Sequence, residues 1–410
     1  MTVDVNGKRE LPQGWCWARL GALLDEALPG FASGERDDQG VIQLRMNNVS
    51  NSGYLVWDEF IRVPKHSAST AKYELHKGDV VFNNTNSTEL VGKSALFEVA
   101  KETIVYSNHF TRLRVKSDNL DPLFLALWLR QQWNERVFER ICNRWIGQSA
   151  VKNDKLLALE LPLPPLPEQH RIAMLLREHL AAVENARRAA QARLEAAQAL
   201  PAALLREIFE SQKAQGWERK KLGEVALLER GKFTPRPRND PRYFNGSHPW
   251  IQIREVETAQ KYILEYTKTL NDQGLSVSKK FPKGTLVISI AASIGALGIL
   301  GFDSCMPDSL VGITPKMQLG NVEYIYYYLL FVRDYLKDIA PQMIQANINL
   351  EILNDFEIAI PSYEQQTNLA LQLDKRLTNI ANLNDRFIAQ LAAIDAMPAA
   401  LLRMAFQGEL

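Results

Sequence analysis

The most regular pattern of apolar and polar residues lies at residues 168–211, in the middle of the chain. Apolar side chains recur there at alternating three- and four-residue steps, the heptad pattern of a helix packed along another helix. The stretch is rich in Ala, Leu, Glu, Arg and Gln, which favour helices. A helix of this length reaches roughly 65 Å, too long for the core of one small domain. The predicted seam positions are Leu176, Leu180, Val183 and Leu194, with Arg187 in a polar slot.

The same pattern returns near the C-terminus, displaced by 197 positions. The sequence PAALLR occurs both at 201–206 and at 398–403, and such self-similarity indicates an internal repeat. The second seam comprises Leu373, Leu377, Ile380, Phe387, Leu391 and Ile394, with Asn384 in the polar slot. We predict antiparallel packing, because a pseudo-two-fold axis between the repeats places one domain at each end. Arg187 and Asn384 either fix the register of the pair or simply lie at the edge of the seam.

The segments before the two helices also correspond, with offsets that vary and so indicate insertions. Each contains a short strand (42–45; 251–254), a glycine turn and apolar strand (77–82; 283–288), and a helical stretch (121–140; 322–339). The apolar runs at 80–97 and 286–302 are predicted to form strand-turn-strand units. The fold class is therefore α+β: two similar α/β domains separated by two long antiparallel coiled-coil helices. We place the first domain at 1–163, its helix at 164–213, the second domain at 214–360 and its helix at 361–410.

Composition bounds the class of protein. A chain of 410 residues with 46% hydrophobic residues can build two or three domains with real cores. The formal net charge of +1 does not by itself indicate a nucleic-acid binder. The three cysteines are far apart and resemble free thiols in a reducing compartment, and no secretory signal or membrane span is predicted. We expect a cytoplasmic protein that does not enter a membrane.

Motifs for catalysis are present only in altered form. The run ending at Lys93-Ser94 resembles a phosphate-binding loop, but Ser87 occupies the position of its first glycine. The run from Asp240 to Tyr243 resembles the D-P-P-Y loop of amino-methyltransferases, with Arg242 in place of the second proline. The six histidines show no metal-ligand spacing. We predict no catalytic residues and no metal in this chain.

Local charge is more informative than net charge. Residues 230–283 contain 11 Lys and Arg against 5 Asp and Glu, interspersed with aromatic residues. Basic loops of this kind bind phosphates, and Arg and Asn side chains can contact base edges. Any one of these residues is more simply explained as solvated surface; the second-half cluster as a whole favours DNA. The candidate DNA-binding residues are Arg45, Asn84, Asn86, Lys93, Arg112, Arg114, Arg144, Arg230, Lys232, Arg236, Arg238, Arg242, Arg254, Lys279 and Lys280.

Taken together, the duplicated motifs resemble the specificity subunit of a type I restriction-modification system over essentially the whole chain. The motifs are the Gly-Trp entries at 14–15 and 216–217, the IQLR and PWIQIR strands, QANIN at 345–349, and PLPPLPEQ before the first helix. Two copies are altered: QSAVK at 148–152 replaces QxNIN, and PSYEQQ precedes the second helix.

The resemblance implies recognition of DNA without catalysis. Such subunits carry two target recognition domains, each reading one half of a bipartite, asymmetric double-stranded DNA site. Their helices set the spacer and dock two modification (methyltransferase) subunits, which bind S-adenosylmethionine and methylate adenine. Restriction subunits, which use ATP and Mg, can join as further partners. Two alternatives remain open at this stage: a stand-alone DNA-binding or scaffold protein of the same duplicated build, and a self-sufficient DNA methyltransferase or endonuclease.

Overall fold

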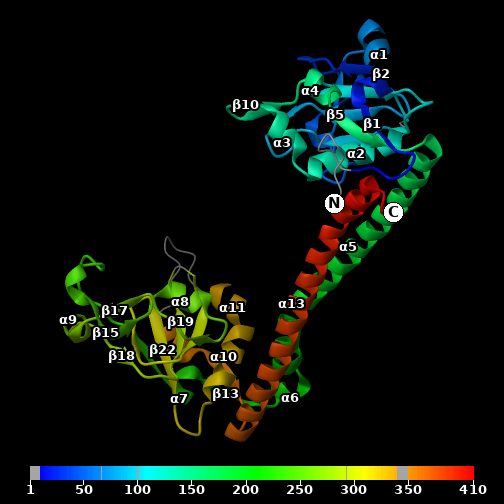
Figure 1. Cartoon of the computed structure of the whole chain (residues 1–410). Coiled ribbons are helices and arrows are strands. Elements are labelled where there is room, and N and C mark those ends of the chain that lie inside the picture. The colour runs from blue at the N-terminus through cyan, green and yellow to red at the C-terminus, as the bar shows by residue number, and fades with distance from the viewer. Residues whose placement is uncertain (1–9, 66, 99–100, 292, 339–349) are drawn as a thin grey trace. The chain divides into compact units, whose positions relative to one another are not determined.

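The computed structural model describes residues 10–65, 67–98, 101–291, 293–338 and 350–410, and it forms two compact units (Figure 1). The first unit comprises Met1–Gln191 and Ala389–Leu410, and the second comprises Ala192–Ile388. Each unit therefore holds one globular domain together with parts of both long helices. The predicted order of domain, helix, domain and helix is the order of elements along the chain. The boundaries of the compact units, in contrast, fall inside the two long helices.

The two long helices are α5 (Leu166–Phe209) and α13 (Tyr363–Gln407). The predicted seam positions of α5 are buried, from Leu176 with 0% exposure to Val183 with 8%. In α13 Leu373 is buried, and the other predicted seam positions are partly buried between exposed neighbours. The heptad spacing therefore located the packed face of both helices.

Contacts inside each unit show that α5 and α13 run antiparallel. In the first unit, Leu176 near the start of α5 shares a core with Leu402 near the end of α13. In the second unit, the end of α5 meets the start of α13, where Glu207 and Arg376 form an ion pair of 3.2 Å. The prediction of an antiparallel pair is confirmed.

In its described residues, the domain of the first unit contains four small sheets. Their strands, in spatial order, are β1 (Cys16–Arg19) and β12 (Glu160–Leu163); β2 (Leu24–Pro29), β9 (Phe110–Val115), β5 (Val80–Asn83) and β7 (Ser94–Leu96); β4 (Ile61–Val63), β3 (Val41–Leu44) and β8 (Ile104–Tyr106); and β10 (Asn143–Trp145), β11 (Gln148–Ala150) and β6 (Thr85–Asn86). The helices are η1 (Leu20–Leu23), η2 (Met46–Asn48), α1 (Ser67–Tyr73), α2 (Pro122–Asn134), α3 (Val137–Ile141) and α4 (Asn153–Leu157).

The described part of the second unit's domain has three sheets. Their strands are β13 (Glu218–Lys221) and β23 (Glu357–Ile360); β14 (Ala226–Arg230), β22 (Leu310–Pro315), β19 (Leu286–Ser289), β20 (Leu297–Leu300) and β16 (Tyr262–Ile263); and β17 (Lys268–Leu270), β15 (Phe244–Trp250), β21 (Ser304–Cys305) and β18 (Lys280–Phe281). The helices are α6 (Gln212–Gln215), α7 (Leu222–Val225), η3 (Pro241–Tyr243), α8 (Ile253–Thr258), α9 (Asp272–Ser276), α10 (Val322–Phe331), α11 (Arg333–Asp338) and α12 (Leu350–Asp355).

The internal repeat extends to strand pairing. The order β2-β9-β5-β7 in the first unit matches β14-β22-β19-β20 in the second, and the parallel pair β3–β8 matches the parallel pair β15–β21. The strand-turn-strand predictions are confirmed, because β5 pairs with β7 and β19 with β20, all antiparallel. The glycine turns precede these units as predicted, with φ of 94° at Gly78 and 86° at Gly284, a left-handed conformation that glycine adopts without strain.

Two predicted elements differ from the structure. The stretch 251–254 is not a strand: β15 ends at Trp250, and α8 begins at Ile253 because the Glu255 carboxylate accepts the backbone N–H of Gln252. The helical stretch at 121–140 is divided into α2 and α3 at Arg136, whose φ of 56° is left-handed. The corresponding stretch of the second unit is divided at Val332, and its predicted end at Ile339 lies outside the described residues, as does the QANIN motif at 345–349.

Among the described residues, one helix, α13, is long and apolar enough to cross a membrane by length and composition alone. Only 6% of its most apolar stretch is buried, and the seam positions within it are partly buried. In both units other residues of the same helix pack on α5.

Candidate nucleic-acid interface

Arg45 and Arg254 align in the sequence repeat, and each follows the strand that its domain pairs in parallel, β3 or β15. The backbone capping differs by two residues, because the N–H of Arg45 donates to Asn48 whereas that of Gln252 donates to Glu255. Arg45 directly follows β3, and Arg254 lies in the first turn of α8, four residues after the end of β15. Both side chains are exposed, and no acidic side chain within the described residues pairs with either guanidinium. An exposed, unpaired guanidinium keeps its five N–H donors available for a phosphate or for the acceptor edge of guanine. Both were predicted as DNA-binding residues, and the structure gives them the accessibility which that role requires.

The second unit has a cavity of about 420 Å³ beside Arg254. Aromatic rings form part of its wall, with the ring centroids of Phe233 and Trp250 5.0 Å apart. The ammonium group of Lys268 lies 5.9 Å from the centre of the Phe244 ring. The remaining lining residues are mostly polar: Arg238, Asn239, Gln252, Ile253, Pro307 and Ser309. Cations and amides above aromatic rings can contact phosphates and base edges, so this cavity is the centre of the candidate interface in the second unit.

The basic loop before this cavity is held by internal contacts. Arg238 pairs with Asp308 at 2.7 Å, and the Arg230 guanidinium donates to the backbone carbonyl of Asp308. The Arg236 guanidinium donates to backbone carbonyls of its own loop, including that of Pro235 at 2.9 Å. The Lys232 ammonium group is exposed and has no acidic partner in the described part of the chain.

The other predicted cations of the second unit form surface ion pairs. Arg242 pairs with Asp240, Lys279 with Glu229, and Lys280 with Asp303. Side-chain hydrogen bonds from Arg242 are the main reason that the pKa of the Asp240 carboxyl lies below its usual value. Surface pairs contribute little stability and are screened by salt. These cations can therefore exchange a carboxylate for a phosphate without disturbing the fold.

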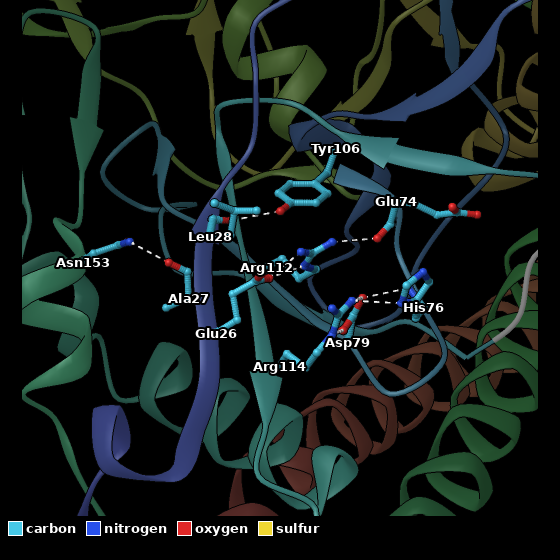
Figure 2. Close-up of polar contacts among 10 residues, drawn as sticks. All are labelled: Glu26, Ala27, Leu28, Glu74, His76, Asp79, Tyr106, Arg112, Arg114 and Asn153. Carbon is cyan, nitrogen blue, oxygen red and sulfur yellow. Dashed lines mark hydrogen bonds and ion pairs between the residues drawn. The ribbon is translucent and has the colours of Figure 1, made fainter. Parts of the chain in front are cut away.

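Arg112 is buried and Arg114 is partly exposed but bound to Asp79, so neither presents a free guanidinium as predicted. Figure 2 shows both guanidinium groups in a polar network with Glu26, Glu74, His76 and Asp79. Arg112 is 3% exposed, pairs with Glu26 and donates to the backbone carbonyl of Glu74 at 2.7 Å. Arg114 donates to both carboxylate oxygens of Asp79, at 2.8 and 2.9 Å. These arginines hold the strands of the sheet together, so we remove them from the candidate interface.

Three further candidates of the first unit are engaged inside the domain. The Lys93 ammonium group is 8% exposed and donates to the backbone carbonyl of Val49, while burial lowers its pKa. Asn84 is 9% exposed and donates to the Thr111 hydroxyl at 3.0 Å. The side-chain amide of Asn86 donates to Asn83 at 2.7 Å. Lys93 and Asn84 cannot reach DNA from these positions, and Asn86 shapes a loop. Arg144, in contrast, is exposed on β10.

His109 lies beside Arg45 and was not predicted from the sequence. Its pKa is lowered by partial burial and, secondarily, by the positive charge of Arg45. Its backbone carbonyl accepts hydrogen bonds from the Asn84 backbone N–H and the Asn83 side-chain amide, both at 3.0 Å. The loop of Asn83 and Asn84 therefore holds the histidine in place and does not itself contact DNA. The internal repeat could have identified His109 as a candidate site residue, because it aligns with Ser309, which lines the cavity of the second unit.

The loops next to the two arginines carry opposite charge. Gly30 and Gly231 start them at equivalent points, where an added Cβ would lie 2.3 and 2.2 Å from a backbone oxygen. Residues 30–40 then contain three acidic residues and one arginine, whereas residues 231–240 contain three basic residues and one aspartate. The two domains therefore share a scaffold and present loops of different charge beside these two arginines.

Comparison with known proteins identifies the class. The family described as type I restriction modification DNA specificity domain matches residues 32–195 and 214–392, so the chain belongs to this family. It is a non-catalytic, DNA-binding specificity subunit of a type I restriction-modification system. The match falls on both halves of the repeat, which confirms the resemblance seen in the sequence.

Individual relatives agree with this class. The MjaX specificity subunit of a type I restriction enzyme from Methanocaldococcus jannaschii is 23% identical over 381 residues, covering 89% of this chain and 87% of that protein. The EcoEI specificity subunit of Escherichia coli is 24% identical over 171 residues, 40% of this chain and 28% of that protein. The HsdS subunit from Thermoanaerobacter tengcongensis has a similar fold, with a TM-score of 0.69 at 22% identity over 98% of this chain and 99% of that one. A chain from a type I R-M system complex gives a TM-score of 0.74 at 22% identity, covering 98% and 100%.

Proposed function

We propose that the chain reads a bipartite, asymmetric DNA site, with each unit reading one half. The observation that carries this proposal is the pair Arg45 and Arg254, which align in the sequence repeat and, among the described residues, are exposed and unpaired just after the equivalent strands β3 and β15. Equivalent scaffolds would approach two half-sites in the same way. Different loops beside the arginines would select different bases, which makes the two halves of the site unlike.

Readout in each half would combine two kinds of contact. Exposed cations such as Lys232 and Lys268 bind phosphates and position the domain, whereas Arg45 and Arg254 contact base edges in the major groove. The cavity beside Arg254 supplies Asn239 and Gln252, whose amides match the donor and acceptor pattern of adenine. Bending of the DNA would add readout of its shape.

The long helices serve in this proposal as spacer and docking surface. α13 exposes Met397 and Met404, by 46% and 40%, on one face among small alanine side chains that permit close helix packing. This surface fits helices of two modification subunits, which would bring S-adenosylmethionine to the complex. Restriction subunits with ATP and Mg would join as further partners. The chain itself needs no cofactor, and the complex would act in the cytoplasm, where the DNA is.

Adenine methylation mapped at base resolution across the source genome, with and without this gene, tests the proposal. We expect one gapped, two-part motif to lose methylation in the deletion strain and to regain it on complementation. That motif defines both half-sites and the gap. An unchanged methylation pattern in a strain that makes the protein would contradict the proposal and favour a stand-alone DNA-binding or scaffold protein.

A further inference from the structure

The β10–β11 hairpin of the first unit carries two large apolar side chains at its tip. Trp145 is 60% exposed and Ile146 is fully exposed, and Gly147 completes the turn with a φ of 77°. Figure 1 shows the hairpin, labelled β10, projecting from the body of this unit. Single exposed apolar residues are ordinary, but an adjacent Trp and Ile at a projecting tip are a feature of binding surfaces.

The base of the hairpin is continuous with the surface around Arg45. β11 pairs with β6, where Ser149 lies opposite Asn86. The loop that carries β6 is bonded to His109 through Asn83 and Asn84, and the charge of Arg45 acts on His109. The hairpin therefore extends from the same loop cluster as the arginine assigned to DNA in the first unit.

The surroundings of the tip are basic. Residues 136–155 contain five Lys and Arg against two Asp and Glu. Arg144 is exposed on β10 itself, and Lys155 holds the base of the hairpin by donating to the Ile141 carbonyl at 2.7 Å. An apolar tip surrounded by cations complements DNA, whose phosphates flank a stack of apolar base faces.

We propose that Trp145 and Ile146 form a wedge that enters the DNA bound by the first unit and unstacks a base step. The inference rests on the proposed function, because it places the wedge in the half-site read by that unit. Two side chains are too few for a protein interface, which needs roughly 800 Å² from each partner. A wedge of one or two apolar residues, in contrast, is enough to open a base step and bend the duplex.

The test uses the full chain in complex with its modification subunits. The probe is a duplex of the methylated motif in which 2-aminopurine, whose fluorescence rises on unstacking, replaces one purine at a time. We expect a fluorescence rise at one step of one half-site with the natural chain and loss of that rise in Trp145→Ala/Ile146→Ala. The affinity of this variant should fall by about 5- to 150-fold, the effect of losing aromatic stacking on a base.

Two control variants separate the wedge from other roles. Trp57→Ala removes another exposed tryptophan of the same unit and should keep both the fluorescence rise and the affinity. Arg144→Ala should reduce the slope of log Kd against log salt by about one, because it loses a phosphate contact, whereas the wedge variant should leave the slope unchanged.

Three outcomes would overturn the inference. Tight binding by the natural chain without any fluorescence rise excludes a wedge. An equal rise in Trp145→Ala/Ile146→Ala shows that other residues unstack the step. Loss of modification-subunit binding in this variant, with the rise retained, assigns the tip to a protein partner. Failure of the natural complex to bind the motif at all would instead contradict the proposed function, and the wedge would fall with it.

Discussion

Gln169 and Gln366 lie 197 positions apart and make the same three hydrogen bonds, one set in each unit. Each side chain is 1% exposed. Each Oε1 accepts a backbone N–H, from Asp121 at 2.9 Å and Asn321 at 2.8 Å respectively. Each Nε2 donates to two backbone carbonyls, those of Asn119 and Pro164 in the first unit and of Leu319 and Pro361 in the second. One buried amide thus fastens the start of each long helix to the turn before α2 or α10.

Replacing either glutamine with leucine should destabilise its unit. Gln169→Leu and Gln366→Leu keep the approximate volume but leave one N–H and two carbonyls without their partner. We expect a loss of about 1–3 kcal/mol in the free energy of unfolding for each variant, measured by urea denaturation. Gln198→Leu, at an exposed position of α5, is the control and should change stability by less than about 0.5 kcal/mol. Equal stability of all three variants would show that the amide does not fasten the helix.

The seam of the long helices was predictable because it depends on local spacing alone. A helix of known period exposes or buries each position in turn, so Leu176 and Leu373 could be assigned without knowledge of the domains. The boundary at Trp250 was not predictable in this way. The residues after Trp250 alternate between apolar and polar side chains, as in a strand. A helix begins there because Glu255, three residues beyond Gln252, accepts the Gln252 N–H.

The candidate interface was predicted only in part, because a cation's role depends on distant partners. Arg45 follows Leu44 at the end of a strand and Arg112 follows Thr111 inside one, and the residues next to them in the sequence do not reveal the partner of either guanidinium. Arg112 is removed from solvent by Glu26, which is 86 positions away in the sequence. Arg45 has no such partner among the described residues. The position in the repeat was the better guide, since Arg45 aligns with Arg254.

The proximity of Arg45 and His109 predicts a pH effect. Burial and the charge of Arg45 lower the pKa of His109 below its usual value near 6.5. Because folding lowers this pKa, protonation favours the unfolded state. The contribution of His109 to stability is therefore complete above its ordinary pKa and is lost as the pH falls toward the lowered value.

Arg45→Gln should raise the His109 pKa and reduce this loss of stability in acid. NMR titration of labelled histidine measures the pKa directly. Arg188→Gln, on the exposed side of α5, should leave the titration unchanged. A His109 pKa that does not respond to Arg45→Gln would contradict the placement of these two side chains.

The exposed face of α13 should bind the modification subunits. Met397→Glu places a charge on that face, and we expect the affinity for these subunits to fall about tenfold or more, because an interface would bury the carboxylate without a partner. Mass photometry of the mixed subunits measures the complex. Glu195→Gln, on the exposed surface of α5, is the comparison and should assemble normally. Full assembly of Met397→Glu would place the docking surface elsewhere.

The gap between half-sites should follow the length of the helix pair. Insertion of one heptad into α5 and a matching heptad into the opposed part of α13 keeps the seam in register and lengthens each helix by about 10 Å. We expect a methylated motif with a different gap and the same two half-sites. A changed half-site would contradict the role of the helices as a spacer.

The central claim is that each unit reads one half-site through its exposed arginine. The most direct test maps adenine methylation in strains that carry Arg45→Ala or Arg254→Ala as the sole copy of the chain. The loss of a base contact weakens discrimination by about 1–3 kcal/mol at the position concerned. We predict that Arg45→Ala relaxes one half of the motif, Arg254→Ala relaxes the other, and the gap stays constant in both. Relaxation of the same half by both variants, or an unaltered motif in both, would contradict the account.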